Sequence, residues 1–445
     1  AADFTGSFDG AQEAVGERSE VYEGYFHFRA TLRGLTPDTA YVYRVGCEGA
    51  WSEPATFTTA TSGDRFAFLY MGDVQEGHEV WGGMLQQIAA QHPGLKFALI
   101  GGDLVDQGGD VEEWQRFFHA AWPVFRRIPL MPAVGNHDDA ELFGNLFAVP
   151  RNGPEGYEGT IYSFDYGNCH VVVLDSNRMG IPGAGDYERI AGWLQNDLAA
   201  SKQRWKFVVL HHPPYPAVYD WRADVLQEHW VPLFEQGGVD MVFVGHQHVY
   251  MRTKPLRGGQ VCSDGEGIVY VMGNAGTKYY GPGPDYEYIA EEVAWVSNYQ
   301  VIDVQGDTLT MTARDSEGEV IDTYTVVKHP AAGNALYAIS PLADAVYQIG
   351  VTPDGIATMT VAAGVSGMKY FGVKVAPVME HEGLEAVVFG HFRSGSQLGL
   401  NVTKADFDRV EGAQAGFNVQ PGDVIKVYIV DDLTNAVDRN PTLLQ

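Results

Sequence analysis

The sequence predicts an α/β fold: a layered sheet domain flanked by helices, with β-sandwich domains at both ends. Between about residues 64 and 328, short apolar strands alternate with helical stretches, a pattern typical of buried strands in a helix-covered sheet. The segments on either side alternate apolar and polar residues, as half-exposed strands do. The chain has 445 residues, more than one hydrophobic core usually holds. We therefore expect domains over residues 1–62, 63–330 and 331–445.

The N-terminal segment is predicted to form part of a β-sandwich. Residues 25–32 alternate as a strand does, the turn signal Thr36-Pro37-Asp38 follows, and residues 41–45 alternate again. A complete sandwich of this kind usually needs about 100 residues. We expect the domain over residues 1–62 to be incomplete or to lean on its neighbour.

Five apolar strands in the middle of the chain each lead into a polar cluster. The strands are expected over residues 66–71, 97–100, 130–134, 207–210 and 241–244. The clusters that follow them are Gly72-Asp73, Gly101-Gly102-Asp103, Gly135-Asn136-His137-Asp138, His211-His212-Pro213-Pro214 and Gly245-His246-Gln247-His248. Ligands of open α/β sheets collect at the carboxyl ends of strands, so these clusters can converge in one crevice.

The C-terminal part is predicted to be a second β-rich domain. A hairpin around Glu317-Gly318 is expected to close the middle domain near Lys328, and residues 329–333 have the composition of a link. Strand patterns then recur, for example over residues 356–361 and 424–430. We interpret this region as an accessory sandwich that contacts a surface or a carbohydrate.

Composition limits the partners and the location. Asp and Glu number 57 against 29 Lys and Arg, so the net charge of −28 repels nucleic-acid backbones and argues against such a partner. No apolar run reaches about 18 residues, which argues against a membrane span. Three scattered cysteines form no disulfide framework. The start Ala1-Ala2-Asp3 is compatible with a removed leader, and we expect a secreted or cell-surface protein.

The five clusters supply the donor set of a metal centre. They offer two carboxylates, one carboxamide and three imidazoles, from Asp73, Asp103, Asn136, His211, His246 and His248. Hard oxygen donors with imidazoles suit Fe, Zn or Mn and match neither a calcium cage nor a thiolate cluster. A carboxylate shared by two cations would hold them roughly 3.5 to 4 Å apart, the spacing that clamps a phosphoryl group. The chemistry favoured is phosphoester hydrolysis.

The ordered clusters resemble the signature of the calcineurin-like metallophosphoesterases, and within that superfamily they are most similar to the purple acid phosphatases. The segments Tyr41-Val42-Tyr43-Arg44-Val45-Gly46 and Trp51-Ser52-Glu53 resemble the fibronectin-like domain that precedes the catalytic domain in those enzymes. The resemblance covers about residues 20–328. It implies a layered β-sandwich flanked by helices and a binuclear metal-dependent phosphatase.

Carried over residue by residue, the resemblance assigns each donor a role. Asp103 would bridge the two metals, with Asp73 and His248 on the first and Asn136, His211 and His246 on the second. A hydroxide activated by the metals would attack phosphorus, most readily that of a phosphomonoester. His137 would stabilise the phosphoryl oxygens or protonate the leaving alkoxide.

Two positions depart from the purple branch. Its members carry Gly-Asp-x-x-Tyr, with a tyrosinate that gives the colour, whereas this chain has Asp106 in place of the tyrosine. Other branches place a histidine two residues after the first aspartate, where this chain has Gln75. We expect a colourless or non-ferric centre, and the completion of the first site by Gln75, Asp106 or a water stays open.

Several alternatives accompany this prediction. Tyr215, Tyr250, Arg252, Lys278 and Tyr279 follow or precede the clusters and would either contact substrate or pack at the rim. His212 is expected to pack behind the site, because only one of two adjacent residues on a strand points into it. Asp138, where purple phosphatases tend to have Glu, hints at a phosphodiesterase. A third alternative is a cell-surface binding protein with a degenerate phosphatase domain.

Overall fold

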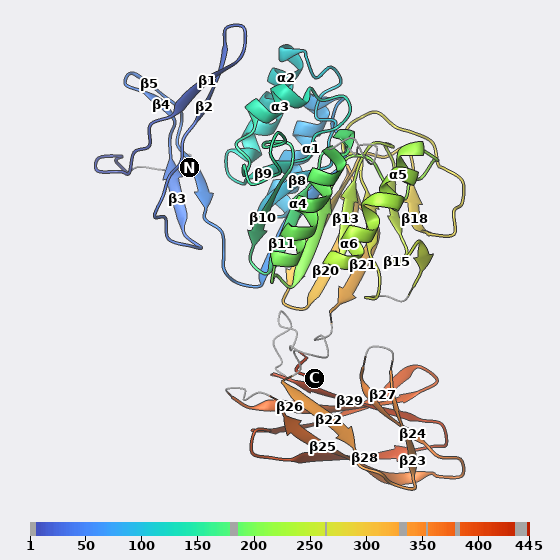
Figure 1. The fold of residues 1–445 in the computed structure, drawn as a ribbon. Helices are drawn as coiled ribbons and strands as arrows, with labels where there is room; N and C mark the ends of the chain where they lie inside the picture. The colour runs from blue at the N-terminus through green and yellow to red at the C-terminus, as the bar shows by residue number, and fades with distance from the viewer. Residues whose placement is uncertain are drawn as a thin grey trace. The chain divides into compact units, whose positions relative to one another are not determined.

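The computed structural model describes residues 6–178, 186–262, 265–328, 336–352, 355–378, 383–431 and 443–445. The chain divides into two compact units, Ala1–Val326 and Val327–Gln445, both drawn in Figure 1. The link expected over residues 329–333 lies outside the described residues.

The first unit begins with small two-stranded sheets. The pairs are β1 with β2, β3 with β6 and β4 with β5. Their bounds are β1 (Glu17–Tyr22), β2 (Tyr25–Arg29), β3 (Ala40–Tyr43), β4 (Gly46–Cys47), β5 (Ala50–Trp51) and β6 (Ala55–Thr58). Among the described residues 6–62, only Ala55 is fully buried. The described sheets therefore form no closed sandwich. They lean on the rest of the unit, where Arg29 Nη2 donates to the Phe147 carbonyl at 3.0 Å and Tyr43 Oη to the Arg126 carbonyl at 2.8 Å.

Two large mixed sheets form the centre of this unit. One has six strands in the order β21-β20-β19-β7-β8-β9, and the other has seven in the order β10-β11-β12-β13-β17-β14-β18. The six strands are β7 (Arg65–Met71), β8 (Leu95–Ile100), β9 (Leu130–Pro132), β19 (Asn298–Gln305), β20 (Thr308–Asp315) and β21 (Val320–Val327). The seven are β10 (Tyr162–Tyr166), β11 (Cys169–Val173), β12 (Trp205–Val209), β13 (Met241–Val244), β14 (Tyr250–Thr253), β17 (Val269–Met272) and β18 (Ile289–Val293). A small hairpin of β15 (Leu256–Arg257) and β16 (Gln260–Val261) lies beside them.

The sheets pack face to face through apolar side chains. Phe68 of β7 contacts Phe207 and Phe243 of the other sheet, with ring centroids 5.6 and 6.1 Å apart. On the opposite face of β7, Met71 Sδ accepts from Trp81 Nε1 of α1 at 3.5 Å. Because successive residues of a strand point to opposite faces, the apolar run of β7 serves both the core between the sheets and the helices outside.

Helices cover the outer faces, which completes the predicted layered α/β fold. α1 and α2 pack on the six-stranded sheet, and α4, α5 and α6 share an apolar core with the seven-stranded one, as Figure 1 shows. The helices are α1 (His78–Gln91), α2 (Val111–Phe125), α3 (Ala140–Leu146), α4 (Asp186–Ala200), α5 (Trp221–His229) and α6 (Val231–Gly237), and a 3-10 turn spans Ser176–Arg178. Asp110, Asp139 and Asp220 cap α2, α3 and α5 by accepting main-chain N–H bonds, as N-cap residues do.

Strand direction brings the carboxyl ends together. β7, β8 and β9 are parallel, and so are β11, β12, β13 and β17. A bridge between Asp73 and Asn274 joins the residues that follow β7 and β17, one from each sheet. The polar clusters predicted after five strands therefore meet at one edge shared by both sheets. The strand expected over residues 130–134 ends earlier, at Pro132.

The second unit is a β-sandwich. A three-stranded sheet, β22-β25-β28, and a five-stranded sheet, β23-β24-β29-β26-β27, share one apolar core. Their bounds are β22 (Tyr337–Pro341), β23 (Tyr347–Val351), β24 (Ala357–Val361), β25 (Gly367–Pro377), β26 (Glu385–Arg393), β27 (Ser396–Ala405), β28 (Gly412–Val419) and β29 (Val424–Val430). Inside it, Asp423 accepts from Arg393 and lies 2.7 Å from His391 Nε2.

Among the described residues, no helix combines the length and the apolar character that crossing a membrane requires.

Candidate metal centre

The candidate metal centre lies where the loops after β7, β8, β9, β12 and β13 converge. The nearest ligand atoms of Asp73, Asp103 and His211 all lie within 4.8 Å of one another. Asn136, His246 and His248 join them through the contacts described below. The structure thus brings together all six side chains that the sequence nominated as ligands.

Asp73 is fully buried and incompletely paired. Its Oδ1 accepts from the His246 main-chain N–H at 2.7 Å, while its Oδ2 accepts no hydrogen bond from any described residue. Nε2 of His248 lies 3.4 Å from that Oδ2. Burial and the neighbouring Asp103 raise the pKa of Asp73 to about 8, against the opposing charge of His211. A positive charge nearby would stabilise the ionised form of this buried carboxylate.

Asp103 and His211 form the central pair. Asp103 Oδ2 lies 3.3 Å from His211 Nε2, and Oδ1 accepts from the His137 main-chain N–H at 2.9 Å. Although burial acts in the other direction, the charge and hydrogen bond of His211 lower the pKa of Asp103 to about 2. The His211 Nδ1 lies 2.9 Å from the Gly101 carbonyl, to which it donates. That bond fixes the tautomer and leaves Nε2 as the atom facing the site.

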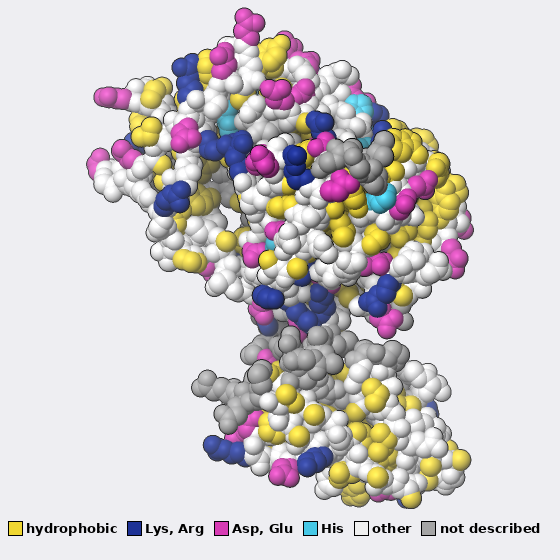
Figure 2. All heavy atoms as spheres, viewed as in Figure 1, with side chains coloured by type: hydrophobic (Ala, Val, Ile, Leu, Met, Phe, Trp, Pro, Cys, Tyr) yellow, Lys and Arg dark blue, Asp and Glu magenta, His cyan; other side chains and the backbone are white. Residues whose placement is uncertain are grey.

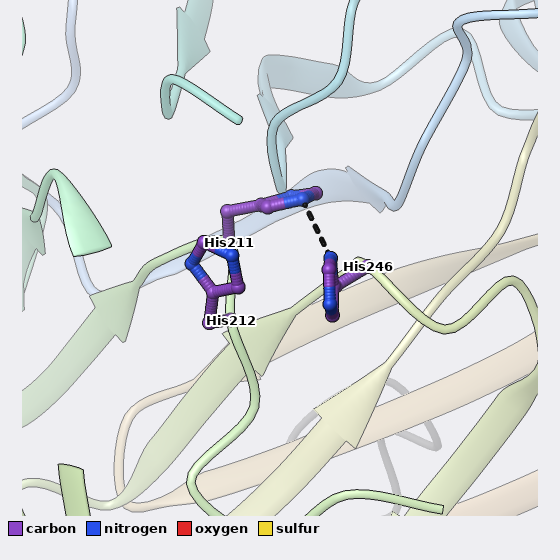
Figure 3. A group of neighbouring side chains, drawn as sticks. All are labelled: His211, His212 and His246. Carbon is purple, nitrogen blue, oxygen red and sulfur yellow. Dashed lines mark hydrogen bonds between the residues drawn. The ribbon is translucent and has the colours of Figure 1, made fainter. Parts of the chain in front are cut away.

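His246 faces both the centre and a carboxylate behind it. Its Nδ1 lies 3.2 Å from His211 Nε2, the contact dashed in Figure 3, and its Nε2 lies 3.1 Å from Asp220 Oδ2. An imidazole held by a carboxylate through one nitrogen presents the other to a metal in many protein sites. Burial and the charge of His211 lower the pKa of His246 to about 4, so the ring is a neutral donor near pH 7.

His212 was expected to pack behind the site, but its ring lies next to the rings of the ligand candidates. Its ring is 4.5 Å from that of His246, centroid to centroid, and Figure 3 shows the three histidine rings side by side. Nδ1 lies 2.9 Å from Ser176 Oγ, whereas Nε2 has no hydrogen-bond partner among the described residues. Burial and the two neighbouring histidines lower its pKa. Because Ser176 holds the ring, we assign His212 to the support of His246.

His248 is buried beside Asp73. Burial and the charge of Lys278 lower the pKa of this imidazole to about 4, and the side-chain amide of the neighbouring Asn274 acts in the opposite direction. Asn274 is itself fully buried, and its Nδ2 donates to the Lys278 carbonyl at 2.8 Å. Asn274 therefore fixes the main chain at Lys278, next to the ring of His248.

Asn136 and His137 occupy the open side of the centre. Asn136 is exposed, and its Oδ1 lies 3.0 Å from His211 Nε2. His137 is about one-third exposed; its Nδ1 lies 2.8 Å from the Asp106 carbonyl and 3.2 Å from the Asp106 carboxylate. Because Nδ1 is engaged, Nε2 is the atom that can reach a substrate.

Gln75 and Asp106, the two departures from the purple pattern, contact each other. Gln75 Nε2 donates to Asp106 Oδ1 at 3.2 Å, and Gln107 Nε2 donates to Oδ2 at 3.1 Å. The buried Oε1 of Gln75 has no hydrogen-bond partner among the described residues. Asp106 thus positions His137, while Gln75 retains an unused oxygen beside the first site.

Local backbone geometry is adapted to the centre. Asp103, His246 and His248 have φ of 50°, 76° and 47°, values uncommon for residues other than glycine and often found at functional sites. A Cβ on Gly245 would lie 2.1 Å from Asp73 Oδ1, and one on Gly135 would lie 2.1 Å from Asp103 Oδ1. Both carboxylates therefore occupy space that only glycine leaves open.

Sequence reasoning missed two supporting residues. Asn274 follows β17 in a Gly-Asn-Ala-Gly segment that resembles the other strand-end clusters, so the signal was present. Asp220 caps α5 through Oδ1 and holds His246 through Oδ2. Nothing in the local pattern around Asp220 marks this second contact, which depends on the tertiary fold.

Of the five residues predicted either to contact substrate or to pack at the rim, four have structural contacts and one lies near the centre. Tyr250 and Arg252 are buried and bond to Asp322, at 2.6 Å for Tyr250 Oη and for Arg252 Nε. Tyr215 is buried against Tyr270, with ring centroids 4.7 Å apart. Tyr279 Oη lies 2.9 Å from Ser297 Oγ. These four have structural roles, whereas Lys278 lies at the mouth, where its charge affects both His248 and Asp106.

Asp138 also has a structural role. Its Oδ1 accepts from the main-chain N–H of Leu104 at 2.9 Å, and its Oδ2 accepts from that of Gly135 at 2.8 Å. The carboxylate ties the loop after β8 to the loop after β9. It therefore gives no support to the hint of a phosphodiesterase that the sequence raised.

The donor set fits metal ions. Two buried carboxylates, one amide oxygen and three imidazoles converge, and Asp73 Oδ2, Gln75 Oε1 and His248 Nδ1 are buried without hydrogen-bond partners among the described residues. Buried polar groups of native proteins are nearly always satisfied, so such a cluster of exceptions needs an explanation. A cation beside Asp73 would explain the unpaired Oδ2 of that residue, because it would offset the charge of a carboxylate out of contact with water.

Comparisons with known proteins find family matches to two parts of the chain. Residues 66–250 match the family model "Calcineurin-like phosphoesterase", and residues 3–59 match "Purple acid Phosphatase, N-terminal domain". An uncharacterized protein of Mycobacterium tuberculosis is 32% identical over 270 residues, covering 52% of this chain and 51% of that protein. The chain thus spans about half the length of this relative.

Two relatives with named activities match over a longer stretch. Purple acid phosphatase 18 of Arabidopsis thaliana is 27% identical, with 64% of this chain and 69% of that protein covered. Acid phosphatase type 7 of Mus musculus is 26% identical, with 70% and 79% covered.

A solved structure confirms the predicted fold. The purple acid phosphatase PPD1 from yellow lupin (Lupinus luteus) seeds superimposes with a TM-score of 0.58 at 20% identity, over 68% of this chain and 62% of that one. At this identity the likeness concerns the fold alone. Together with the two family models, it confirms the resemblance drawn from the ordered clusters. The chain thus carries a segment that matches the calcineurin-like phosphoesterase domain, preceded by a segment that matches the N-terminal domain of purple acid phosphatases, and over these parts it is similar to purple acid phosphatases.

Proposed function

We propose that this chain hydrolyses phosphoesters, most readily phosphomonoesters, with a binuclear metal centre held by Asp73, Asp103, Asn136, His211, His246 and His248. The observation that carries the proposal is the buried contact of Asp103 with His211, with the partly unpaired Asp73 beside it. The names of two relatives, purple acid phosphatase 18 and acid phosphatase type 7, support a phosphatase.

The six ligand candidates would be divided between two metal positions. Asp73 and His248 would hold one metal, Asn136, His211 and His246 would hold the other, and Asp103 would be shared by both. When bound, the two cations would supply a water nucleophile of lowered pKa and would neutralise charge on the phosphoryl oxygens. Iron, zinc and manganese all suit these donors.

His137 and Lys278 act on the substrate itself. His137 presents Nε2 to the open side of the centre, where it would donate to a phosphoryl oxygen or protonate the leaving oxygen. Lys278 places a positive charge at the mouth near Asp106 and His248. The pair would hold a phosphate dianion better than the single charge of a diester.

A direct comparison of substrates tests this proposal. Metal-replete protein is assayed with an aryl phosphate and with the corresponding bis-aryl phosphate. We expect the higher kcat/KM for the monoester. A higher value for the bis-aryl ester would favour a phosphodiesterase on the same centre, and turnover of neither would favour a binding protein with a degenerate phosphatase domain.

We propose an accessory role for the second unit, in contact with a surface or a carbohydrate, on a secreted or cell-surface protein. Its own apolar core and its compactness as a unit of its own support an independent role. A chain ending at Lys328 should keep its turnover of soluble substrate. If the truncated protein folds but loses this activity, the proposed separation between a catalytic first unit and an accessory second unit is wrong.

A further inference from the structure

An exposed aromatic patch lies at the mouth of the candidate metal centre, and no step of the proposed hydrolysis uses it. Figure 2 shows hydrophobic side chains gathered over α5 and the region of β18. The exposed large side chains of these segments are Val218, Tyr219, Trp221, Tyr280 and Trp295, with exposed fractions from 43 to 65%. We call Tyr219, Trp221, Tyr280 and Trp295 the aromatic rim.

The rim is built directly on two of the metal-ligand candidates. The ring of Tyr280 lies 4.6 Å from that of His248, centroid to centroid, and its main-chain N–H donates to the His248 carbonyl at 3.3 Å. On the other side, Asp220, which lies between Tyr219 and Trp221, contacts His246 Nε2 at 3.1 Å. The aromatic rim is therefore in direct contact with His248 and, through Asp220, with His246.

Two loops that carry the rim lie against each other. Gln247, between the two histidines, accepts from the Val218 N–H at 2.9 Å and donates back to the Val218 carbonyl. Tyr288 Oη donates to the Pro216 carbonyl at 2.5 Å. The loop before α5 and the loop before β18 thus form one continuous surface with the turn that carries His246 and His248.

Trp295 is held outward at an unfavourable backbone geometry. Its φ is 65°, yet its side chain is 64% exposed. A Cβ on Gly281 would lie 3.2 Å from Trp295 Cζ2, so the glycine and the indole are in close contact. A bulky residue with positive φ is a true outlier that persists only where the surroundings fix it. An indole fixed in solvent beside a catalytic mouth indicates a binding surface.

The charges at the mouth complement an anion attached to an apolar ring. Lys278 lies two residues before Tyr280, and its carbonyl accepts a 2.8 Å hydrogen bond from Nδ2 of Asn274, which forms a bridge with Asp73. A phosphate placed at the centre would thus have a cation and then an aromatic face on one side. In an aryl phosphate the ring is bonded directly to the ester oxygen, which matches a rim that starts one ring from His248.

We propose that the aromatic rim selects phosphoesters with an aromatic leaving group, which stacks on Tyr280 and Trp295 while the phosphate occupies the metal centre. This inference rests on the proposed function and names its substrate class. Stacked or edge-to-face ring pairs stabilise a complex beyond the area that they bury.

Ratios of kcat/KM test the proposal, because they cancel general damage to the centre. Metal-replete full-length protein is assayed with 1-naphthyl phosphate, glycerol 3-phosphate and adenosine 5′-monophosphate, and metal content is measured for every variant. For Tyr280→Ala and Trp295→Ala we expect the naphthyl-to-glycerol ratio to fall about 2- to 10-fold each. Tyr280→Phe, which keeps the ring, should keep the ratio.

Trp122→Ala is the matched control, since Trp122 lies on α2 and is 48% exposed; it should leave the ratio unchanged. A second readout avoids leaving-group chemistry: phenylphosphonate should inhibit more strongly than methylphosphonate, and Tyr280→Ala should reduce that difference.

The outcomes separate the two proposals. If the esters are hydrolysed and the naphthyl-to-glycerol ratio of kcat/KM is the same in wild type, Tyr280→Ala and Trp295→Ala, the proposed role of the rim is wrong. The proposed phosphatase activity would still hold. A fall confined to the adenosine-to-glycerol ratio would also overturn it, in favour of a nucleobase held at a distance. Turnover of no ester would overturn the proposed function, and the rim with it.

Discussion

The carboxylate of Asp73 accepts a 2.7 Å hydrogen bond from the main-chain N–H of His246. Asp73 follows β7 of the six-stranded sheet, and His246 follows β13 of the seven-stranded sheet. This bond therefore ties the two sheets together at the edge where the candidate metal centre lies. It also sets the distance between two ligand candidates from different halves of the fold, so small changes there should have large effects.

Replacing Gly245 by alanine tests that tie. The new Cβ would lie 2.1 Å from Asp73 Oδ1, so the carboxylate or the loop must move. A displacement of about 1 Å at a catalytic site can reduce the rate about 100-fold. We expect Gly245→Ala to lower both bound metal and kcat/KM by at least about 10-fold. Gly94→Ala is the control, because its Cβ would meet no atom within 4 Å. Equal metal content in the two variants would refute the argument.

His137 is expected to act after metal binding. Its main-chain N–H bonds to Asp103, but its side chain contacts Asp106 and none of the ligand candidates. His137→Ala should therefore keep both metals and lower kcat by about 100- to 10,000-fold, the usual contribution of a positioned acid or base. Elemental analysis alongside steady-state kinetics checks this. Loss of metal together with activity would instead make His137 a ligand.

The metal-replete protein should be colourless. The position three residues after Asp103 carries Asp106, whose carboxylate accepts hydrogen bonds from Gln75 and Gln107. A carboxylate at this position cannot produce the intense visible band that tyrosinate gives with ferric iron. An absorption spectrum of protein loaded with iron provides the test. An intense visible charge-transfer band would show that another tyrosine binds the metal.

His170 should make the first unit less stable at alkaline pH. Its Nδ1 lies 2.6 Å from Asp165 Oδ1, and its Nε2 lies 2.8 Å from Asp197 Oδ2. Burial opposes protonation, but the two carboxylates outweigh it and raise the pKa of His170. The stabilisation is therefore complete below the unfolded-state pKa of about 6.5 and is lost as the pH rises through the higher folded-state pKa.

We expect His170→Gln to lower the free energy of unfolding by about 1 to 2 kcal/mol at pH 6, because Asp197 is largely buried whereas the side chain of Asp165 is 53% exposed and screened by solvent, and by less at pH 9. Denaturant unfolding of wild type and variant at both pH values measures this. His119→Gln, at an exposed position of α2, serves as the control. A difference between wild type and His170→Gln that grows with pH would contradict the assignment.

Much of the candidate centre could be predicted from the sequence because its ligands sit at a topologically special place. Each follows an apolar strand directly, and parallel strands bring their carboxyl ends to one edge. Asp73 and His246 could thus be grouped although 173 positions separate them. The layered fold could be predicted for the same reason, since alternation of buried strands and helices leaves few arrangements.

Other features depend on contacts that no local pattern encodes. Asp220 reads as an ordinary helix cap, and only the tertiary fold directs its second oxygen to His246. Tyr250 and Arg252 follow a ligand cluster as a substrate contact would, yet they turn to Asp322, about 70 residues away. Asn274, in contrast, could have been predicted as a site residue, because Gly273-Asn274 follows β17 as Gly72-Asp73 follows β7.

Metal stoichiometry tests the central claim most directly. Wild-type protein and Asp103→Asn are purified without added metal, and iron, zinc and manganese are measured in each by elemental analysis. Because Asp103 would bridge both positions, we predict about two metals per chain in the wild type and fewer than one in the variant, with turnover of an aryl phosphate lost in parallel. Equal metal content and equal activity in the two proteins would contradict the binuclear centre.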